Sequence, residues 1–218
     1  MQIEITPDLK KVYPDSIFGY LIIKNVPNSK KHEALEERKR DLEKLIRDTL
    51  GEVDKDDIIQ NYDAYFKMWN KTYPIEYQIN TIKSGGRFPQ VSVLVDNMFV
   101  AELKSRLLTS GHDLDEIRGD LTFDVSRGME EYQKLSGQEQ KLKKNDVILK
   151  DHEGLLACIL YGPARKTSIT LKTKNALYFA WCPFATDEGL IITHLNEILD
   201  NMKHIFGSVS SEYQLLRS

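Results

Sequence analysis

The sequence predicts an α+β domain with layered sheets, and three observations support this fold class. One apolar run of strand length and two amphipathic helices occupy the first half of the chain. Several short apolar runs follow in the second half, between an entering helix and a closing helix. Strands grouped in this way, without regular alternation with helices, are typical of α+β folds. The 218 residues are enough to bury a large core without disulfides or a metal.

The first half begins with a strand and continues with two helices. Residues Ile17–Ile23 form an apolar run of the length of a buried strand. A helix is expected over roughly residues 32–49, where leucines recur on one face. A second helix is expected over roughly residues 55–71, with an aromatic stripe that ends before Pro74. Helical spacing favours a buried face for this stripe over a base-stacking surface.

The second half is expected to begin after the break at Ser84–Pro89, which carries two glycines and a proline. A core helix follows, because apolar residues recur every four positions from Val95 to Leu107. Strands are predicted in the runs Leu121–Val125, Val147–Leu149, Leu155–Leu160, Ser168–Leu171 and Ala176–Trp181.

The chain closes with a helix predicted over Glu188–Phe206, with Asp187 as its N-cap and Gly207 past its end. The break described above divides the chain into two expected parts. Residues 1–83 form an N-terminal α/β extension, and residues 84–218 form the core domain. The two amphipathic helices of the extension are expected to cover a sheet face of the core, so that both parts make one compact unit.

Composition and charge exclude several classes of protein. The chain has 30 Lys and Arg residues against 33 Asp and Glu residues, a net charge of −3 and an isoelectric point of about 6.0. Strong non-specific nucleic-acid binders usually carry an excess of basic residues, so RNA binding would need a local basic patch. No apolar run approaches the ~18 residues of a membrane span, and the N-terminus lacks the pattern of a signal peptide. A cytoplasmic protein without membrane contact is expected.

The two cysteines, Cys158 and Cys182, indicate neither a disulfide framework nor a metal site. Both lie in apolar runs and form no Cys-x-x-Cys pair, so buried thiols are expected. The run Asp151-His152-Glu153-Gly154 holds potential ligands, but consecutive residues are poorly placed around one metal, which favours a turn. We expect no metal and no cofactor.

A first candidate site lies ahead of the strand Leu121–Val125, where a polar turn holds His112 and neighbouring carboxylates. A histidine beside a carboxylate can act as a general base near neutral pH, and a loop position suits a group that faces a substrate. Asp113 could instead cap the short turn Leu114–Ile117 by accepting hydrogen bonds from its free backbone N–H groups. His112 could likewise have a purely structural role.

A second candidate site is rich in basic groups and hydroxyls. Its members are Arg165, Lys166, Thr167, Thr170, Lys172, Thr173 and Lys174. Basic side chains and hydroxyls at this density can hold the phosphate backbone of a nucleic acid. The alternative is a solvated strand edge, on which lysines oppose aggregation.

The sequence from about Phe88 to Gly207 resembles a known family. The matching positions include Asp113-Leu114-x-x-Ile117-x-Gly119-Asp120, Leu135-x-Gly137, Asp151-x-x-Gly154 and Thr167-x-Ile169-Thr170-x-x-Thr173-x-Asn175. In this order they resemble the B3/B4 module of the phenylalanyl-tRNA synthetase beta subunit, and more closely the free-standing single-domain proteins built on it. The resemblance implies a layered, β-sandwich-like B3/B4 module with packed helices, here over residues 84–218.

The resemblance also implies a function in binding tRNA or aminoacyl-tRNA, with hydrolysis of mischarged aminoacyl-tRNA in trans as an extension. In the bacterial synthetases the corresponding turn reads His-Ala-Phe-Asp, and its histidine is implicated in editing. When the two turns are aligned on Asp113, Ser110 replaces that histidine and His112 takes the aromatic position. A synthetase glutamate that contacts the misactivated amino acid corresponds to Phe179.

Two hypotheses follow from these residues. In the first, the protein binds tRNA or its aminoacyl end, with hydrolysis of a mischarged ester in trans as an extension. His112 and Ser110 then line the pocket, Asp113 supports the turn, and the second candidate site contacts the nucleic acid. In the second, the protein is a non-catalytic module that binds RNA, an amino-acid-like ligand or a protein partner. The acidic isoelectric point and the two replaced editing residues favour the second hypothesis. No oligomeric state follows from the sequence.

Overall fold

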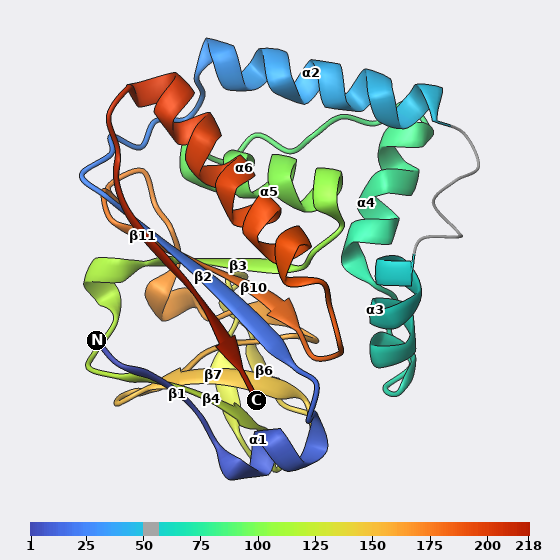
Figure 1. Cartoon of the computed structure of the whole chain (residues 1–218), viewed down its shortest axis with the longest axis vertical. Helices are drawn as coiled ribbons and strands as arrows, with labels where there is room; N and C mark the ends of the chain where they lie inside the picture. The colour runs from blue at the N-terminus through green and yellow to red at the C-terminus, as the bar shows by residue number, and fades with distance from the viewer. Residues whose placement is uncertain (50–56) are drawn as a thin grey trace.

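The computed structural model describes residues 1–49 and 57–218 and confirms the α+β fold class (Figure 1). Two main sheets and one hairpin hold its strands. The five-stranded sheet has the order β1 (Ile3–Ile5), β4 (Leu121–Val125), β7 (Val147–Asp151), β8 (Gly154–Cys158), β9 (Gly162–Pro163). The four-stranded sheet has the order β11 (Ser210–Arg217), β2 (Ile17–Lys24), β10 (Ala176–Cys182), β3 (Thr109–Asp113). The hairpin pairs β5 (Glu131–Gln133) with β6 (Glu139–Lys141).

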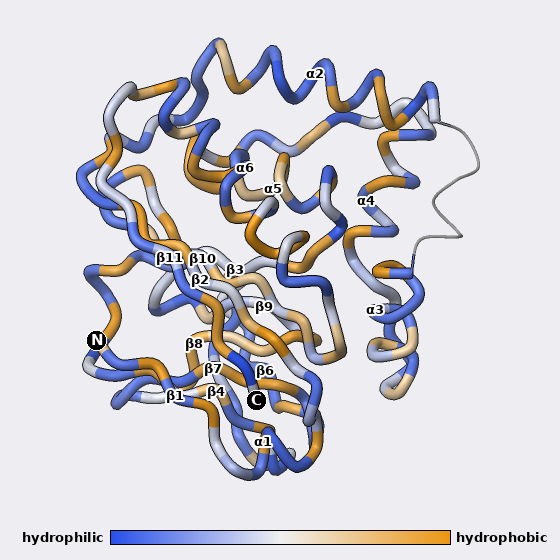
Figure 2. Tube along the Cα trace, viewed as in Figure 1, coloured by the Kyte–Doolittle hydropathy of each residue, from blue (hydrophilic) through white to orange (hydrophobic). Residues whose placement is uncertain are grey.

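Helices cover one face of the four-stranded sheet, and the five-stranded sheet packs on its other face (Figure 1). The described helices are α1 (Pro7–Val12), α2 (Glu33–Asp48), α3 (Asp57–Lys67), α4 (Pro74–Lys83), α5 (Val93–Ser105) and α6 (Glu188–Phe206), with two short 3₁₀ turns, η2 (Leu114–Glu116) and η3 (Arg165–Thr167). α1 does not belong to this helix layer and lies against β4 of the five-stranded sheet (Figure 1). α5 and α6 lie on the four-stranded sheet, and α2 lies across them. α2 is largely hydrophilic (Figure 2), because only a narrow stripe that includes Leu35 and Leu42 is buried. This is the pattern of a surface helix.

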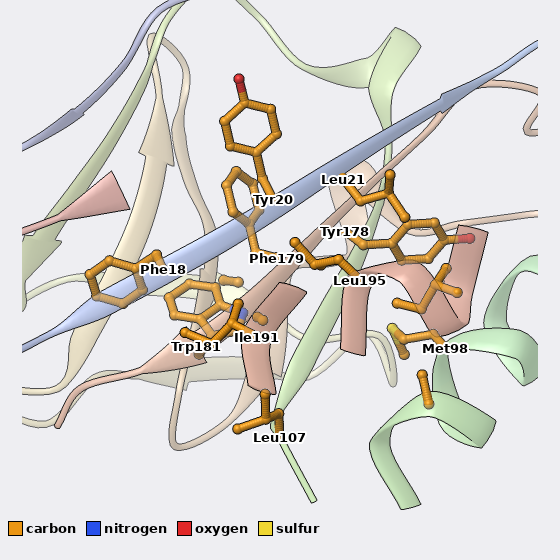
Figure 3. Close-up of a cluster of buried hydrophobic side chains, with 14 of the residues drawn as sticks. Phe18, Tyr20, Leu21, Met98, Leu107, Tyr178, Phe179, Trp181, Ile191 and Leu195 are labelled. Atoms are coloured by element: carbon orange, nitrogen blue, oxygen red, sulfur yellow. The ribbon is translucent and has the colours of Figure 1, made fainter. Parts of the chain in front are cut away.

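Strand β10 explains the layers, because all seven of its residues are buried. Side chains alternate along a strand, so Tyr178 faces the helices and Phe179 faces the five-stranded sheet (Figure 3). The Tyr178 hydroxyl donates to the carbonyl oxygen of Leu94 in α5 at 3.0 Å. The Phe179 ring lies 5.2 Å from the Phe123 ring of β4, in an edge-to-face contact. A strand covered on both faces is therefore apolar along its whole length.

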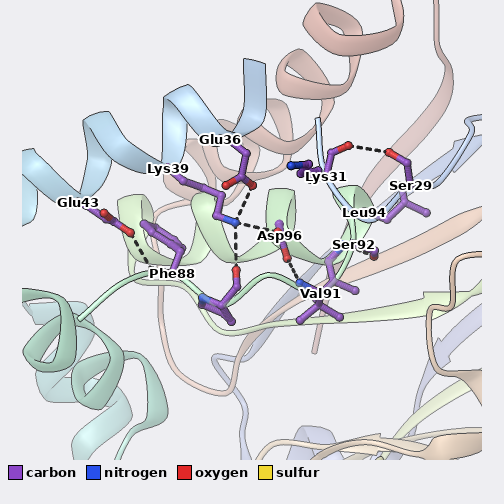
Figure 4. A network of polar contacts seen from close by, with 12 residues as sticks. Ser29, Lys31, Glu36, Lys39, Glu43, Phe88, Val91, Ser92, Leu94 and Asp96 are labelled. Carbon is purple, nitrogen blue, oxygen red and sulfur yellow. Dashed lines mark hydrogen bonds and ion pairs between the residues drawn. The ribbon is translucent and has the colours of Figure 1, made fainter. Parts of the chain in front are cut away.

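A buried ion pair fastens α2 to α5 (Figure 4). Lys39 Nζ lies 2.9 Å from Asp96 Oδ2 and 2.9 Å from Glu36 Oε1, and it also donates to Pro89 O at 3.1 Å. The other Asp96 oxygen accepts a hydrogen bond from Val91 N at 2.9 Å. Buried charges are tolerated when they are paired and hydrogen-bonded. This network fixes the start of α5, which lines the cavity described below.

Several predicted elements are confirmed. α6 spans Glu188–Phe206, and the Asp187 side chain caps it by accepting from Gly189 N at 2.7 Å. The strand predicted at Ile17–Ile23 is β2, and the strand predicted at Leu121–Val125 is β4. These elements have strong periodicity or clear ends, which is why the sequence predicts them well.

The second predicted helix ends earlier than expected, and its expected start at residues 55 and 56 lies outside the described part. α3 ends at Lys67, and Asn70 adopts a left-handed conformation with φ of 54° in the following turn. Pro74 does not stop a helix but opens α4, which the sequence did not predict. Proline fits the first turn of a helix because the N–H that it lacks would have no partner there.

The predicted strand Ser168–Leu171 is also wrong. This segment is irregular, and it ends in a turn in which Thr173 N donates to Thr170 O at 3.1 Å. The Thr173 hydroxyl accepts a further hydrogen bond from Thr170 N at 2.9 Å. Threonine hydroxyls thus satisfy backbone groups that a neighbouring strand would otherwise satisfy. The core helix ends earlier than its periodicity suggests, because Arg106 is left-handed and Leu107 is buried outside the helix.

The N-terminal residues contribute strands to both sheets. β1 pairs with β4 in parallel, and β2 lies between β11 and β10 in the four-stranded sheet. The division into parts 1–83 and 84–218 stays a prediction, and the extension supplies a central strand as well as helices.

Removing residues 1–85 is expected to prevent native packing. Without β2, one edge of β10 loses its hydrogen-bonding partner, and β11 loses its only partner strand in the described part of the chain. We expect a shortened chain that begins at Gly86 to be insoluble or molten, with secondary structure but no near-ultraviolet circular dichroism. The full chain is the control. Cooperative thermal unfolding of the shortened chain would contradict this expectation.

Candidate functional site

A cavity of about 300 Å³ opens beside β3, at the edge of the four-stranded sheet. Its walls come from α4, α5, β9 and the segment after η3, and they are mostly apolar, as at Ile75, Met98 and Ile169. Thr109, Ser110 and Gly111 of β3 and the side chains of Gln78 and Glu102 add polar groups. An apolar cavity with a few converging polar groups is the usual form of a ligand site.

A larger hollow of about 570 Å³ lies between β1 and β11, with Glu4, Asp120 and His152 in its lining. None of the sequence-predicted site residues lines it. Another hollow of about 570 Å³ is lined by Arg165 and Lys166 of the second candidate site, but many of its other lining residues are polar. The cavity beside β3 combines mainly apolar walls with Ser110 of the first candidate site, so it is the candidate site.

Glu102 places a buried carboxyl group in the wall of the cavity. Its side chain belongs to α5, is 3% exposed, and accepts a hydrogen bond from Thr109 N at 2.6 Å. Burial raises the pKa of Glu102 to about 8, although the Thr109 hydrogen bond opposes this shift. The carboxyl group is therefore mainly protonated at neutral pH and can donate a hydrogen bond.

Sequence reasoning missed Glu102, although a signal was present. The residue lies three positions after Phe99 and seven after Val95, on the apolar stripe of the predicted core helix. A glutamate on such a stripe is rarely fully buried without a partner or a function. The amide of Gln78 was also missed: its Oε1 atom is buried and makes no hydrogen bond with the described residues.

Ser110 and His112 come together, as the sequence suggested, but not in a loop. Both belong to β3, and the His112 ring is completely buried. His112 Nε2 lies 2.9 Å from Ser110 Oγ, and Nδ1 lies 2.8 Å from Thr167 Oγ1. Trp181 Nε1 also donates to Ser110 Oγ at 2.9 Å. Burial lowers the pKa of His112 to about 3, so the ring is neutral at pH 7.

The loop position expected for His112 is therefore wrong. Residues 109–113 pair with β10, and this pairing turns the imidazole inward, away from solvent. Ser110 lines the cavity and His112 does not, so His112 can reach a ligand only through Ser110. Phe179 is also fully buried and faces the other sheet. The catalytic roles of Ser110 and His112 stay predictions.

Asp113 takes the structural position that the sequence left as an alternative. Its Oδ1 accepts from Asp115 N at 3.1 Å, which caps η2. Its Oδ2 accepts from the Thr173 hydroxyl at 2.5 Å. Both oxygens hold the chain around η2, and Asp113 does not line the cavity.

The second candidate site divides into inward and outward groups. Thr167 and Thr173 are buried and bonded to His112 and Asp113, respectively. Lys166 forms an ion pair with Asp151 at 2.7 Å. The remaining members are exposed: Arg165, Thr170, Lys172 and Lys174. Nucleic-acid binding by these residues stays a prediction, and only the exposed groups and the outer face of Lys166 are accessible for it.

A second histidine, His194 of α6, contacts the start of β3 at Thr109. Its ring is buried, with Nδ1 2.8 Å from Ser105 Oγ and Nε2 2.8 Å from Thr109 Oγ1. Burial lowers its pKa to about 4.

Among the described residues, no group of three or more acidic, histidine or cysteine side chains is arranged to hold a metal. No helix in the same part of the chain has the length and apolarity to cross a bilayer.

Residues 70–183 match the B3/4 domain, and they make up just over half of the chain. The chain belongs to the B3/4 domain family. This match confirms the resemblance seen in the sequence, and every residue that lines the cavity lies within it. The part of the fold from α4 to β10 is thus the B3/4 domain of this chain.

One solved structure supports the same fold. It is the crystal structure of an N-terminal fragment of the phenylalanyl-tRNA synthetase beta subunit from Pyrococcus horikoshii. The two structures superpose with a TM-score of 0.52 at 14% sequence identity. The match covers 95% of this chain but only 50% of the fragment, so the chain spans about half the length of that fragment. A search of the curated proteins finds no match.

The raised pKa of Glu102 predicts a pH-dependent stability. A group whose pKa is higher in the folded protein than in the unfolded chain stabilises the fold fully at pH values below the unfolded pKa, which is 4.5 here. This contribution is lost as the pH rises towards the folded pKa of about 8. Relative to Glu102→Gln, the wild type should lose up to about 1.4 kcal/mol of unfolding free energy per pH unit across this window. Denaturant unfolding at a series of pH values measures the difference.

The control for this experiment is Glu37→Gln, which removes an exposed carboxyl group of α2. Its unfolding free energy should follow that of the wild type at every pH. Parallel curves for the wild type and Glu102→Gln would mean that Glu102 is not protonated in the folded protein.

Proposed function

We propose that this B3/4 protein binds the aminoacyl end of a tRNA and places the amino-acid side chain in the cavity beside β3. The observation that carries the proposal is the cavity itself: one apolar hollow of about 300 Å³, formed entirely by residues of the family match. The structural neighbour is part of a phenylalanyl-tRNA synthetase, an enzyme that handles aminoacyl-tRNA by its name, which supports the same partner.

The polar groups of the cavity suit an uncharged ligand end. Protonated Glu102 is a donor, and the buried Gln78 Oε1 atom is an acceptor without a partner in the described part of the chain. A ligand group that both accepts and donates would satisfy the two side chains together. A carboxylate would have to be desolvated in an apolar wall without a cation beside it, which is costly.

Hydrolysis of the ester is a second candidate function, and the Ser110–His112 hydrogen bond is the observation that favours it. Ser110 lines the cavity, and His112, which is hydrogen-bonded to its hydroxyl, could accept a proton from that hydroxyl or, through it, from a water. The depressed pKa of His112 makes it a weak base at neutral pH. Binding is therefore the function that this geometry supports best.

Binding is tested with a panel of tRNAs that carry different amino acids through a stable amide in place of the ester. The protein should bind one or a few charged species at least about tenfold more tightly than the uncharged tRNA, or about 1.4 kcal/mol. Gln78→Leu should remove most of this preference without changing the affinity for uncharged tRNA. Equal affinities for all charged and uncharged species would contradict the proposal.

The hydrolysis candidate is tested with the same panel joined by natural esters. If the protein only binds, ester loss should proceed at the uncatalysed rate for every tRNA. Faster loss from one species, abolished in a folded Ser110→Ala variant, would instead establish the deacylase. Far-ultraviolet circular dichroism and thermal unfolding of the variant verify that it is folded.

A further inference from the structure

Two segments that are far apart in the sequence lie side by side next to the cavity. The loop after β2 contacts the segment between η3 and β10 through three hydrogen bonds (Figure 1). Val26 N donates to Lys174 O at 3.0 Å, and Asn25 N donates to the Asn175 side chain at 2.9 Å. The Asn28 amide donates to the carbonyl oxygen of residue 170 at 2.7 Å.

The same loop is fixed to the first turn of α5. Val93 N donates to Ser29 O at 2.8 Å, and Leu94 N donates to the Asn28 side chain at 3.2 Å. Ser29 Oγ in turn donates to Lys31 O at 3.0 Å, which closes the loop (Figure 4). The residues that flank this turn of α5, Val91 and Val95, line the cavity, so the loop is held close to the cavity's edge.

Five lysines project from these two segments: Lys24, Lys30, Lys31, Lys172 and Lys174. We name them the basic surface. All five are exposed, and none forms an ion pair with any residue that the structure describes. Acidic residues also border them: Glu33 opens α2, and Asp115 already accepts hydrogen bonds from the Asn175 amide. Glu212 of β11 is paired with Ile22 and lies diagonally across from Lys24 on the same face of the sheet. A local excess of positive charge therefore exists on a chain whose net charge is −3.

The basic surface continues from one wall of the cavity. Ser168 and Ile169 line the cavity, and the chain runs on from them through the turn that carries Lys172 and Lys174. Lys30 and Lys31 follow the loop that holds the start of α5, as described above. If one end of a ligand entered the cavity, the rest of its chain would thus lie near both groups of lysines, those of the loop after β2 and those of the turn before β10.

We propose that the basic surface binds the single-stranded phosphate backbone at the 3′ end of the tRNA whose aminoacyl group enters the cavity. This inference rests on the proposed function and adds the loop 24–31, which lies outside the family match at residues 70–183. Lysine suits this role because it is a flexible point charge that reaches phosphates without fixed geometry. Phosphate contacts position a nucleic acid and do not read its sequence, so this surface sets affinity while the cavity sets selectivity.

The test compares two charge-neutralised variants with a matched control. One variant carries Lys24→Gln, Lys30→Gln and Lys31→Gln, and the other carries Lys172→Gln and Lys174→Gln. The control carries Lys10→Gln, Lys11→Gln and Lys143→Gln, which are exposed lysines without ion pairs in the described structure. Lys10 and Lys11 belong to α1, at the other end of the molecule (Figure 1), and Lys143 lies two residues before Asn145, whose carbonyl oxygen accepts from the Tyr13 hydroxyl just after α1. The affinity of each protein for uncharged tRNA is measured by fluorescence anisotropy over a series of salt concentrations.

Each lysine that contacts a phosphate of a single strand contributes about 0.7 to the slope of log Kd against log salt. The triple variant should therefore lose about 2 from this slope and the double variant about 1.4, while the control keeps the wild-type slope. A tRNA without its single-stranded 3′ end should bind the wild type more weakly than the intact tRNA binds the triple variant, because it loses the contacts of all five lysines, or about 3.5 of the slope.

The outcomes separate the inference from the proposed function. If both variants keep the wild-type slope of log Kd against log salt, or if the control loses as much slope as they do, the role of the basic surface is rejected. The proposal that the protein binds tRNA then still stands. A loss that persists for tRNA without its 3′ end assigns the lysines to the duplex and overturns the single-stranded form of the proposal. If the wild type binds no tRNA at any salt concentration, the proposed function itself fails.

Discussion

The complete burial of β10 is the constraint on which the rest of the structure depends. All seven residues from Ala176 to Cys182 are inaccessible, so this strand needs partners on both edges and cover on both faces. β2 and β3 supply the edges, the helices cover one face, and the aromatic ring of Phe123 begins the cover on the other. Because β2 comes from the first 24 residues, the N-terminal part of the chain is built into the centre of the fold.

The same constraint positions the cavity. β3 is the last strand of its sheet, and no strand among the described residues pairs with its outer edge, where α4, α5, β9 and the residues around η3 close the space. The backbone N–H of Thr109 at this edge donates to Glu102, which satisfies one group that a further strand would have paired. The edge of the four-stranded sheet at β3 is thus enclosed as a cavity and is not left exposed for pairing with another strand.

Much of the fold could be predicted from the sequence because its strongest elements follow simple periods. β10 and α6 show long, regular apolar patterns, and Asp187 marks the start of the helix. α4 was missed because its opening proline was interpreted as a stop, although the chemistry of Pro74 allows either. The Thr170–Thr173 turn was missed because side-chain hydroxyls replace strand pairing there, which a pattern of apolar residues does not reveal.

The candidate site was predictable only in part, for a physical reason. The proximity of Ser110 and His112 follows from their spacing of two on one strand face, once the strand is known. Burial, by contrast, depends on contacts between distant residues: Thr167 lies 55 positions from His112, and their hydrogen bond places the ring inside. Glu102 and Gln78 belong to two different helices, and neither shows from its own neighbours in sequence that it faces the cavity.

The buried polar groups around β3 share one property, which is neutrality at pH 7. His112 and His194 are uncharged because burial lowers their pKa values, and Glu102 is mainly uncharged because burial raises its pKa. Each still makes hydrogen bonds, so the interior avoids both unpaired charges and unsatisfied atoms along this strand. Recognition inside the cavity then depends on shape and hydrogen bonding, which salt affects little. Long-range attraction of a polyanion must come from outside, and in the proposed arrangement the exposed lysines beside the cavity provide it. An acidic chain can therefore hold RNA at one face, because its charge there differs from its average.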